Sequence, residues 1–124
     1  EKNKIRFKFN SYFPIKTLNL MRGVIIADED DFLGYYVDKI FDCIWKDGLN
    51  MNDHSIIEKI LKNLNINPKT FLLRLSTQNI KNSLKEKTDD AFKKGIFGAP
   101  SFVVNNKIFW GQDRLEFALV EANK

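Results

Sequence analysis

Two short segments near the C-terminal end hold the residue types best suited to binding a peptide-like ligand. In the first, Ala99-Pro100 precedes an apolar run, where a proline bond can be cis and the missing N–H leaves neighbouring backbone groups free. A cis bond would present the N–H and C=O of Ala99 at a sheet edge, able to pair with an extended ligand. A trans proline that starts a strand is the alternative, and the pattern leaves both open.

The second segment, Gly111-Gln112-Asp113, comes just before a helical pattern. A helix N-terminus has free N–H groups and a dipole that suit a carboxylate, and the Asp113 side chain can take an ammonium group. A ligand with both groups, such as the γ-glutamyl end of glutathione, fits this pairing. Helix capping is the competing interpretation, because Asp113 followed by Glu116 resembles a capping box, and from the residues alone we favour the cap.

The other reactive side chains have simpler structural interpretations. In the acidic run of residues 28–31, Asp30 or Asp31 suits the N-cap of the next helix, where negative charge is favourable, so we do not assign a metal site. Cys43 has no histidine or basic cluster beside it, which favours a small core residue over a nucleophile. His54, the only histidine, is expected at the surface.

Length and composition limit the class of protein. The chain has 124 residues, of which 44% are hydrophobic, and is expected to form about one globular domain. The net charge of +4 comes without a long block of like charge, which argues against nucleic acid binding. A single cysteine excludes an internal disulfide and indicates a reducing, cytoplasmic compartment. No apolar run approaches the roughly 18 residues of a membrane span, and we expect no membrane association or signal segment.

The elements that precede the two segments begin with an alternating pattern, which predicts a half-buried strand over residues 5–9. A turn-rich loop follows at residues 10–14, and the region from Thr17 to Lys94 then reads as about five helices with short loops. Caps for two of them are expected in the loop of residues 50–53 and at Asn67. The apolar residues that we expect to face inward in these helices are Leu18, Met21, Val24, Ile25, Phe32, Leu33, Tyr36, Val37, Ile40, Phe41, Ile44, Trp45, Ile56, Ile57, Ile60, Leu61, Leu64, Phe71, Leu72, Leu75, Ile80, Leu84, Ala91 and Phe92.

The pattern changes after Gly95, which is expected to end the last of these helices. Two short apolar runs, residues 102–104 and 108–110, are joined by Asn105-Asn106, which tolerate the positive φ of a two-residue hairpin turn. Leu115, Ala118, Leu119 and Ala122 then give a helical face after Asp113. The order of strand, helices, two strands and helix predicts an α+β arrangement for these residues.

The run from Gly95 to Arg114 also resembles a known signature. Gly95-Ile-Phe-Gly-Ala-Pro100-Ser-Phe-Val-Val, followed by Ile108-Phe-Trp-Gly-Gln-Asp-Arg114-Leu, is similar to the C-terminal signature of the kappa-class glutathione transferases and 2-hydroxychromene-2-carboxylate isomerases. These are glutathione-binding members of the DsbA-like thioredoxin superfamily. Residues 80–91 resemble the family's helix before the cis-proline loop, and residues 13–22 its entry into an inserted helical domain, so the resemblance covers nearly the whole chain.

The resemblance implies an α/β, thioredoxin-like fold of the DsbA and kappa type. Residues 1–16 would be a strand and linker of the thioredoxin domain, 17–94 the inserted helical domain, and 95–124 the C-terminal hairpin and helix. The family's first βαβ unit, which carries its active-site serine, has no counterpart here, so we expect the N-terminal βαβ half to be missing and assign no catalytic residue in this chain. The absence of an initiator methionine at Glu1 fits a piece of a longer protein.

The resemblance also implies a site and a function. Ala99, beside Pro100, would pair its backbone with the cysteinyl part of glutathione, while Gln112 and Asp113 would hold the γ-glutamyl part, with Arg114 as a nearby support. The implied activity is that of a glutathione-dependent isomerase or transferase, acting as a homodimer on an electrophilic, aromatic small molecule. Two alternatives stay open: a dithiol oxidoreductase, which would need a Cys-x-x-Cys outside these residues, and a non-catalytic truncated module that pairs with another chain through exposed strand edges.

Overall fold

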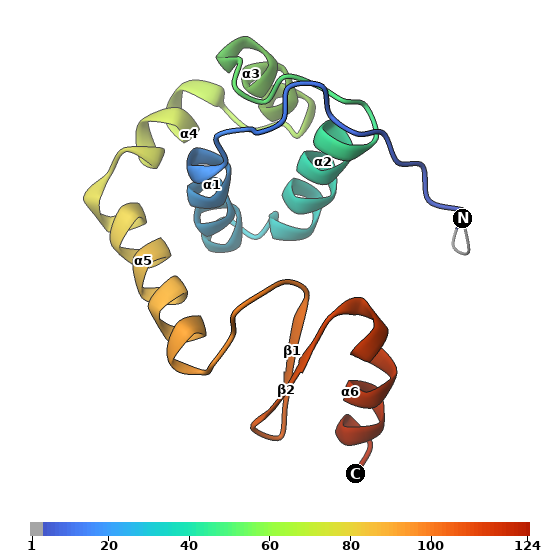
Figure 1. The fold of residues 1–124 in the computed structure, drawn as a ribbon. Helices are drawn as coiled ribbons and strands as arrows, with labels where there is room; N and C mark the ends of the chain where they lie inside the picture. Colours follow the sequence, from blue (N-terminus) through green and yellow to red (C-terminus); the bar gives the residue numbers. More distant parts are fainter. Residues whose placement is uncertain (1–3) are drawn as a thin grey trace. The chain divides into compact units, whose positions relative to one another are not determined.

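The computed structural model describes residues 4–124, so the first three residues of the predicted 1–16 segment lie outside the described part. The elements, drawn in Figure 1, are the helices α1 (Leu18–Glu29), α2 (Leu33–Trp45), α3 (His54–Asn63), α4 (Pro68–Leu75) and α5 (Gln78–Lys93), the strands β1 (Ser101–Val104) and β2 (Lys107–Trp110), the short 3₁₀ helix η1 (Gln112–Arg114) and α6 (Leu115–Ala122). They form two compact units, the first ending at Leu84 and the second running from Lys85 to Lys124. None of the described helices is long and apolar enough to cross a membrane.

Local sequence signals set several helix boundaries. The Asp53 side chain accepts a hydrogen bond from the Ser55 N–H at 2.9 Å at the start of α3, and that of Asn67 accepts from the Thr70 N–H at 3.1 Å at the start of α4. Gly95 follows α5 with a φ of +88°, a conformation that glycine adopts without a steric penalty. These three boundaries confirm the capping predicted from the sequence.

The acidic run between α1 and α2 does not supply the predicted cap. Asp30 ends α1, Asp31 lies outside both helices, and Phe32 occupies the N-cap position of α2 without a side-chain hydrogen bond. Arg74 of α4 instead contacts Glu29 at 2.7 Å and Asp30 at 2.5 Å. The prediction of a cap at Asp30 or Asp31 is therefore wrong, and the run links α1 to α4. The part of the chain that the structure describes contains no group of acidic, histidine and cysteine side chains that could hold a metal ion.

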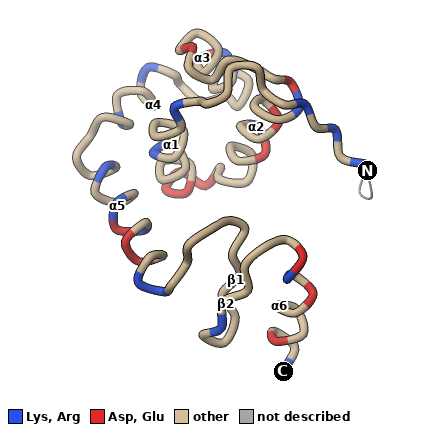
Figure 2. Tube along the Cα trace, in the orientation of Figure 1, with Lys and Arg blue, Asp and Glu red and all other residues tan. Residues whose placement is uncertain are grey.

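Charges of both signs occur on the helices of the chain. Figure 2 shows basic and acidic residues interspersed on the helices, with both signs present on α5. On α5, Lys85 and Asp89 form one of these pairs at a spacing of four residues, with a distance of 2.7 Å. Such a pattern is typical of solvated helix faces.

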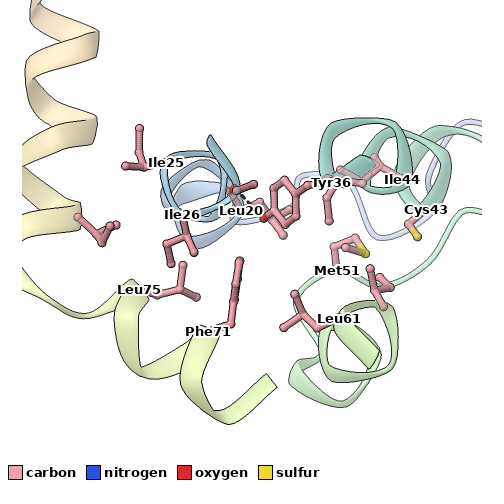
Figure 3. Packing of buried hydrophobic residues seen from close by; sticks show 14 residues of the cluster. Leu20, Ile25, Ile26, Tyr36, Cys43, Ile44, Met51, Leu61, Phe71 and Leu75 are labelled. Atoms are coloured by element: carbon pink, nitrogen blue, oxygen red, sulfur yellow. Dashed lines mark hydrogen bonds between the residues drawn. The ribbon is translucent and has the colours of Figure 1, made fainter. Parts of the chain in front are cut away.

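The core of the first unit lies where α1 and α4 pack and where α2 adds its inward face (Figure 3). Tyr36 reaches from α2 to α1, where its hydroxyl donates a hydrogen bond to the Leu20 carbonyl at 2.8 Å. This bond satisfies the ring's only polar group inside the core, and burial raises the pKa of the hydroxyl. The Phe71 ring of α4 lies 5.9 Å from the Tyr36 ring between centroids, so three helices meet at this aromatic pair.

The apolar spacing predicted the core of α3 and α4 correctly, and for α1 it predicted the buried Ile25 but misplaced the rest of the buried face. Leu18 and Met21 are exposed, whereas Leu20 and Ile26 are buried together with Gly23. Gly23 has no side chain and does not count as apolar in the pattern, yet it lies at the centre of the buried face. The other mispredicted aromatic and aliphatic residues, all exposed, are Phe41, Phe92, Leu115 and Leu119.

We expect the packing at Gly23 to reject even one methyl group. A Cβ at this position would overlap the Tyr36 hydroxyl and lie 2.9 Å from the edge of the Phe71 ring. Gly23→Ala should lower the free energy of unfolding by about 1–3 kcal/mol, measured by urea denaturation, because the core is already full.

Gly34→Ala is the matched control for this change. Nothing lies within 4 Å of a Cβ at Gly34, so alanine there should raise the free energy of unfolding by about 0.5–1 kcal/mol through helix propensity alone. A Gly23→Ala variant as stable as the Gly34→Ala variant would contradict the close approach of Tyr36 and Phe71 to α1.

Residues 5–9 do not form the predicted strand. A strand needs a partner, and the sheet in the described part of the chain consists of β1 and β2 alone. The Lys8 N–H donates instead to the Trp45 carbonyl at 2.6 Å, and Phe7 stacks on the Trp45 ring with 5.7 Å between centroids. The apolar side chains of this segment remain exposed, so the alternation of the sequence is real but unpaired in the structure.

Asn10, which the sequence placed only in a loop, fixes this segment to the end of α2 and the loop after it. Its side chain is fully buried and donates to the carbonyls of Ile44 at 3.0 Å and Leu49 at 2.8 Å, while its oxygen accepts from the Tyr12 N–H at 2.8 Å. The amide thus satisfies backbone groups at and beyond the end of α2 as well as the turn that it starts. A lone asparagine in a polar loop gives no signal for this role, because its partners lie 34 and 39 residues away.

Removing this amide should destabilise the first unit. In Asn10→Ala the buried carbonyl of Ile44 and the partly buried carbonyl of Leu49 lose their donor, and we expect a loss of about 1–3 kcal/mol in the free energy of unfolding, read from urea denaturation. Ser11→Ala, an exposed change in the same loop, is the control and should change stability by less than about 0.5 kcal/mol. A loss no larger than that of the control would show that Asn10 is not the anchor.

The hairpin of the second unit confirms the sequence prediction. β1 pairs antiparallel with β2, with Ser101 opposite Trp110 and Val104 opposite Lys107. The two turn residues, Asn105 and Asn106, have φ values of +50° and +62°, as a two-residue hairpin turn requires. The helix α6 packs on both strands, mainly on β1.

Candidate functional site

The hairpin brings together the two segments that the sequence singled out. Ala99-Pro100 leads into β1 and Gly111 follows β2, so both lie at the end of the hairpin away from its turn. The Gly111 N–H donates a hydrogen bond to the Pro100 carbonyl at 2.9 Å, which continues the ladder beyond the pair of Ser101 and Trp110. Residues eleven positions apart in sequence are thereby held next to each other.

The Ala99 backbone is the first functional group of this end. The bond between Ala99 and Pro100 is cis, the isomer that the sequence left open beside trans. Ala99 is exposed, and among the described residues neither its N–H nor its C=O takes part in a hydrogen bond. One donor and one acceptor of the main chain are thus available to an extended ligand.

Aromatic packing holds the turn before Ala99. The Trp110 indole lies against Gly98, where a Cβ would overlap its Nε1, and the Phe97 ring lies 5.1 Å from the Trp110 ring between centroids. The Ser101 hydroxyl donates to the Gly98 carbonyl at 2.5 Å. Sequence reasoning assigned no packing role to Trp110 or Ser101.

Asp113 is the second functional group, and it is not a cap. The helix α6 begins at Leu115, its N-cap position is Arg114, and no side chain caps it, so the predicted capping box of Asp113 and Glu116 is wrong. Asp113 lies instead in η1 with 78% of its side chain exposed, and its nearest cation is Arg114 at 3.9 Å. Its carboxylate therefore keeps its hydrogen-bonding capacity for another partner.

Gly111 makes room for that carboxylate. Its φ is +101°, a conformation that side chains rarely adopt, and a Cβ there would lie 2.5 Å from Asp113 Oδ1. Arg114 lies with its guanidinium 5.6 Å from the centroid of the Phe117 ring, a cation–π contact that leaves the guanidinium exposed. Gln112 is also exposed. The end of the hairpin thus combines a free peptide group, a carboxylate, a guanidinium and an amide.

A buried carboxylate anchors the opposite end of the hairpin. Glu121 of α6 accepts from Lys124 at 2.9 Å and from Lys107 at 3.0 Å, and the Asn105 side chain lies 3.4 Å from it and 3.1 Å from its backbone carbonyl. The hydrogen bonds from Lys124, Lys107 and Asn105 lower the pKa of Glu121 to about 2. This cluster ties α6 to the hairpin turn, and no pattern in the sequence predicted it.

The ionised form of Glu121 should make the stability of the second unit depend on pH. Its folded pKa of about 2 is below its ordinary value of 4.5, so its contribution is full above pH 4.5 and is lost as the pH falls toward 2. We expect the urea midpoint to fall more steeply over this range for the wild type than for Glu121→Gln. Glu116→Gln, an exposed change on the same helix, should retain the wild-type slope; equal slopes for all three proteins would contradict this role.

The remaining candidate residues lie in the first unit. Cys43 is buried in the core, and burial raises the pKa of its thiol, which confirms the interpretation as a core residue. His54 is exposed at the start of α3, as predicted.

Comparison with known proteins shows which family the chain belongs to. Residues 1–121 match the DSBA-like thioredoxin domain, and the chain therefore belongs to that family. It is 27% identical over 82 residues to a 2-hydroxychromene-2-carboxylate isomerase of Pseudomonas sp. (strain C18), an alignment that covers 66% of this chain and 39% of that protein. It is 24% identical over 95 residues to the 2-hydroxychromene-2-carboxylate isomerase of Sphingobium xenophagum, covering 77% of this chain and 49% of that protein.

A solved structure of a 2-hydroxychromene-2-carboxylate isomerase shares the fold. It superposes with a TM-score of 0.82 and 21% sequence identity, over 94% of this chain and 56% of the other. The resemblance stated from residues Gly95 to Arg114 is thus confirmed. The chain spans less than half of the length of the two relatives named above.

Proposed function

We propose that the protein is a glutathione-dependent isomerase or transferase that acts on an electrophilic, aromatic small molecule, and that this chain supplies part of its glutathione site. The observation that carries the proposal is the end of the hairpin, where the unpaired Ala99 backbone and the free Asp113 carboxylate are joined by the bond between Gly111 and Pro100. The names of the similar proteins support the isomerase direction. By the same resemblance we propose a homodimer.

The groups present fit glutathione in kind. The N–H and C=O of Ala99 suit the peptide groups on either side of a cysteinyl residue, by the pairing that adds an extended peptide to a strand edge. The Asp113 carboxylate suits the α-ammonium of a γ-glutamyl group, and the Arg114 guanidinium and Gln112 amide suit its α-carboxylate. The space that a Gly111 side chain would fill is left to the Asp113 carboxylate.

In this proposal, the residues of the hairpin site bind glutathione and orient it. When bound, glutathione supplies a thiol nucleophile for attack on an electrophilic carbon. Ala99 fixes the cysteinyl part through the main chain, and Pro100, which has no N–H, makes no competing donor beside it. Asp113 and Arg114 set the position of the γ-glutamyl end by charge. Because the chain spans less than half of those relatives, we give these residues binding and orienting roles only.

Replacing Asp113 tests the proposed site. We expect Asp113→Ala to weaken glutathione binding, measured by isothermal titration calorimetry, by about tenfold or more, because a hydrogen bond between charged groups contributes about 1.5–3 kcal/mol. The affinity of Asp113→Asn for glutathione should lie between those of the wild type and Asp113→Ala, since asparagine retains a hydrogen-bond acceptor but no charge.

Glu116→Ala is the matched control, because Glu116 is an exposed acid three residues further on and lies in the first turn of α6. Its affinity for glutathione should equal that of the wild type. If the wild-type protein gives no heat of binding, or if Asp113→Ala binds as tightly as Glu116→Ala, the proposed glutathione site is wrong.

A further inference from the structure

A pocket of about 500 Å³ lies wholly within the first unit. It is formed between α1, α2, α3 and α4, and the loops that precede α1 and α3 complete its lining. All of its lining residues fall between Pro14 and Leu75, so it shares no residue with the hairpin site. Its volume is in the range of about 300–1,000 Å³ that is usual for small-molecule sites.

The inner surface of this pocket is apolar. Five buried side chains from three helices and a loop form its floor, and all five are labelled in Figure 3; they are Leu20, Tyr36, Met51, Phe71 and Leu75. The half-buried Ile57 and Leu72 add to its walls. The Tyr36 hydroxyl hydrogen is already donated to the Leu20 carbonyl. The floor is therefore suited to a hydrocarbon or aromatic body.

The mouth of the pocket carries hydrogen-bond donors and positive charge. The Asn52 side-chain oxygen accepts from the Lys16 N–H at 3.0 Å, which orients the amide and leaves its NH₂ group without a partner among the described residues. Neither the Lys16 ammonium nor the His54 imidazole forms a salt bridge in this part of the chain, and both are exposed. No aspartate or glutamate is among the residues that line the pocket.

We propose that this pocket binds a small apolar carboxylate. The apolar body lies on the floor against the side chains of Tyr36 and Phe71, and the carboxylate accepts hydrogen bonds at the mouth from the Asn52 amide and the Lys16 ammonium. A neutral apolar molecule would leave these donors without an acceptor, and a cation would be repelled by Lys16. The inference goes beyond the proposed function, because it needs neither glutathione nor any residue of the hairpin site.

Sodium decanoate, below the concentration at which it forms micelles, is the probe for this site. Titrated into the ¹⁵N-labelled protein, it should shift amide resonances of residues 51–57 and 71–75 in a saturable way, since these segments contribute to the lining of this pocket and not to that of the smaller pocket beside it. Decanol, which has the same chain but no charge, should bind more weakly by about fivefold or more. Shifts concentrated instead around Phe13 and Trp45, which line a separate apolar pocket of about 240 Å³, would overturn the assignment.

A charge reversal at the mouth isolates the role of Lys16. Lys16→Glu should weaken decanoate binding by about fivefold or more, whereas Lys59→Glu, the same change at an exposed position of α3 outside the pocket lining, should leave it unchanged. Equal affinities of the two variants, or equal affinities for decanoate and decanol, would overturn the proposal. Asp113→Ala should bind decanoate like the wild type, so that failure of the glutathione site and failure of this pocket give different results.

Discussion

At Gly23 and at Gly98 the absence of a side chain allows an aromatic ring to pack directly against the backbone. Each of the two units depends on one of these contacts between a ring and a glycine. Over Gly23, Tyr36 reaches its acceptor on α1 and meets Phe71 of α4. Against Gly98, the Trp110 indole fixes the turn that leads to Ala99. A methyl group at either glycine would need a shift of the ring, and packed interiors resist such shifts. The two glycines thus determine which helices meet in one unit and how the hairpin ends in the other.

In the second unit, the hydrogen bonds that fix α6 to the hairpin lie near the turn, and the unpaired polar groups lie at the opposite end of the hairpin. Glu121 concentrates its hydrogen bonds near the turn, where Lys107 and Lys124 hold its charge. At the opposite end a single bond from Gly111 to Pro100 closes the ladder. Because α6 is fixed through Glu121, the carboxylate of Asp113 is not needed as a cap and stays exposed. This division explains how a short helix and two short strands can present polar groups without losing their own packing.

The sequence correctly predicted the features that depend on residues close together in the chain. The caps at Asp53 and Asn67, the glycine after α5 and the two-residue turn of the hairpin depend on bonds that span only a few positions. Predictions from the sequence were wrong or missing where the partner is distant in the chain. Arg74 binds the acidic run across 44 residues, and Asn10 binds its acceptors across similar sequence separations. The prediction of a strand at residues 5–9 was wrong for the same reason. An alternating pattern indicates which side chains share one face of a strand, but it does not show whether another strand is present to pair with it. Of the site, the residue types were predicted, but the free state of Asp113 was not.

The two proposed sites recognise a carboxylate by different means. In the hairpin site a fork-shaped guanidinium stands beside an acid, which suits a ligand with both charges close together. In the helical pocket an ammonium and an amide stand above an apolar floor, which suits one charge at the end of a hydrocarbon body. Each site draws its residues from one unit, so each affinity can be measured with the other site disabled. If decanoate changes the affinity for glutathione by some factor, glutathione must change the affinity for decanoate by the same factor, because the coupling free energy belongs to both ligands. Unequal factors would show that one of the two ligands also binds elsewhere.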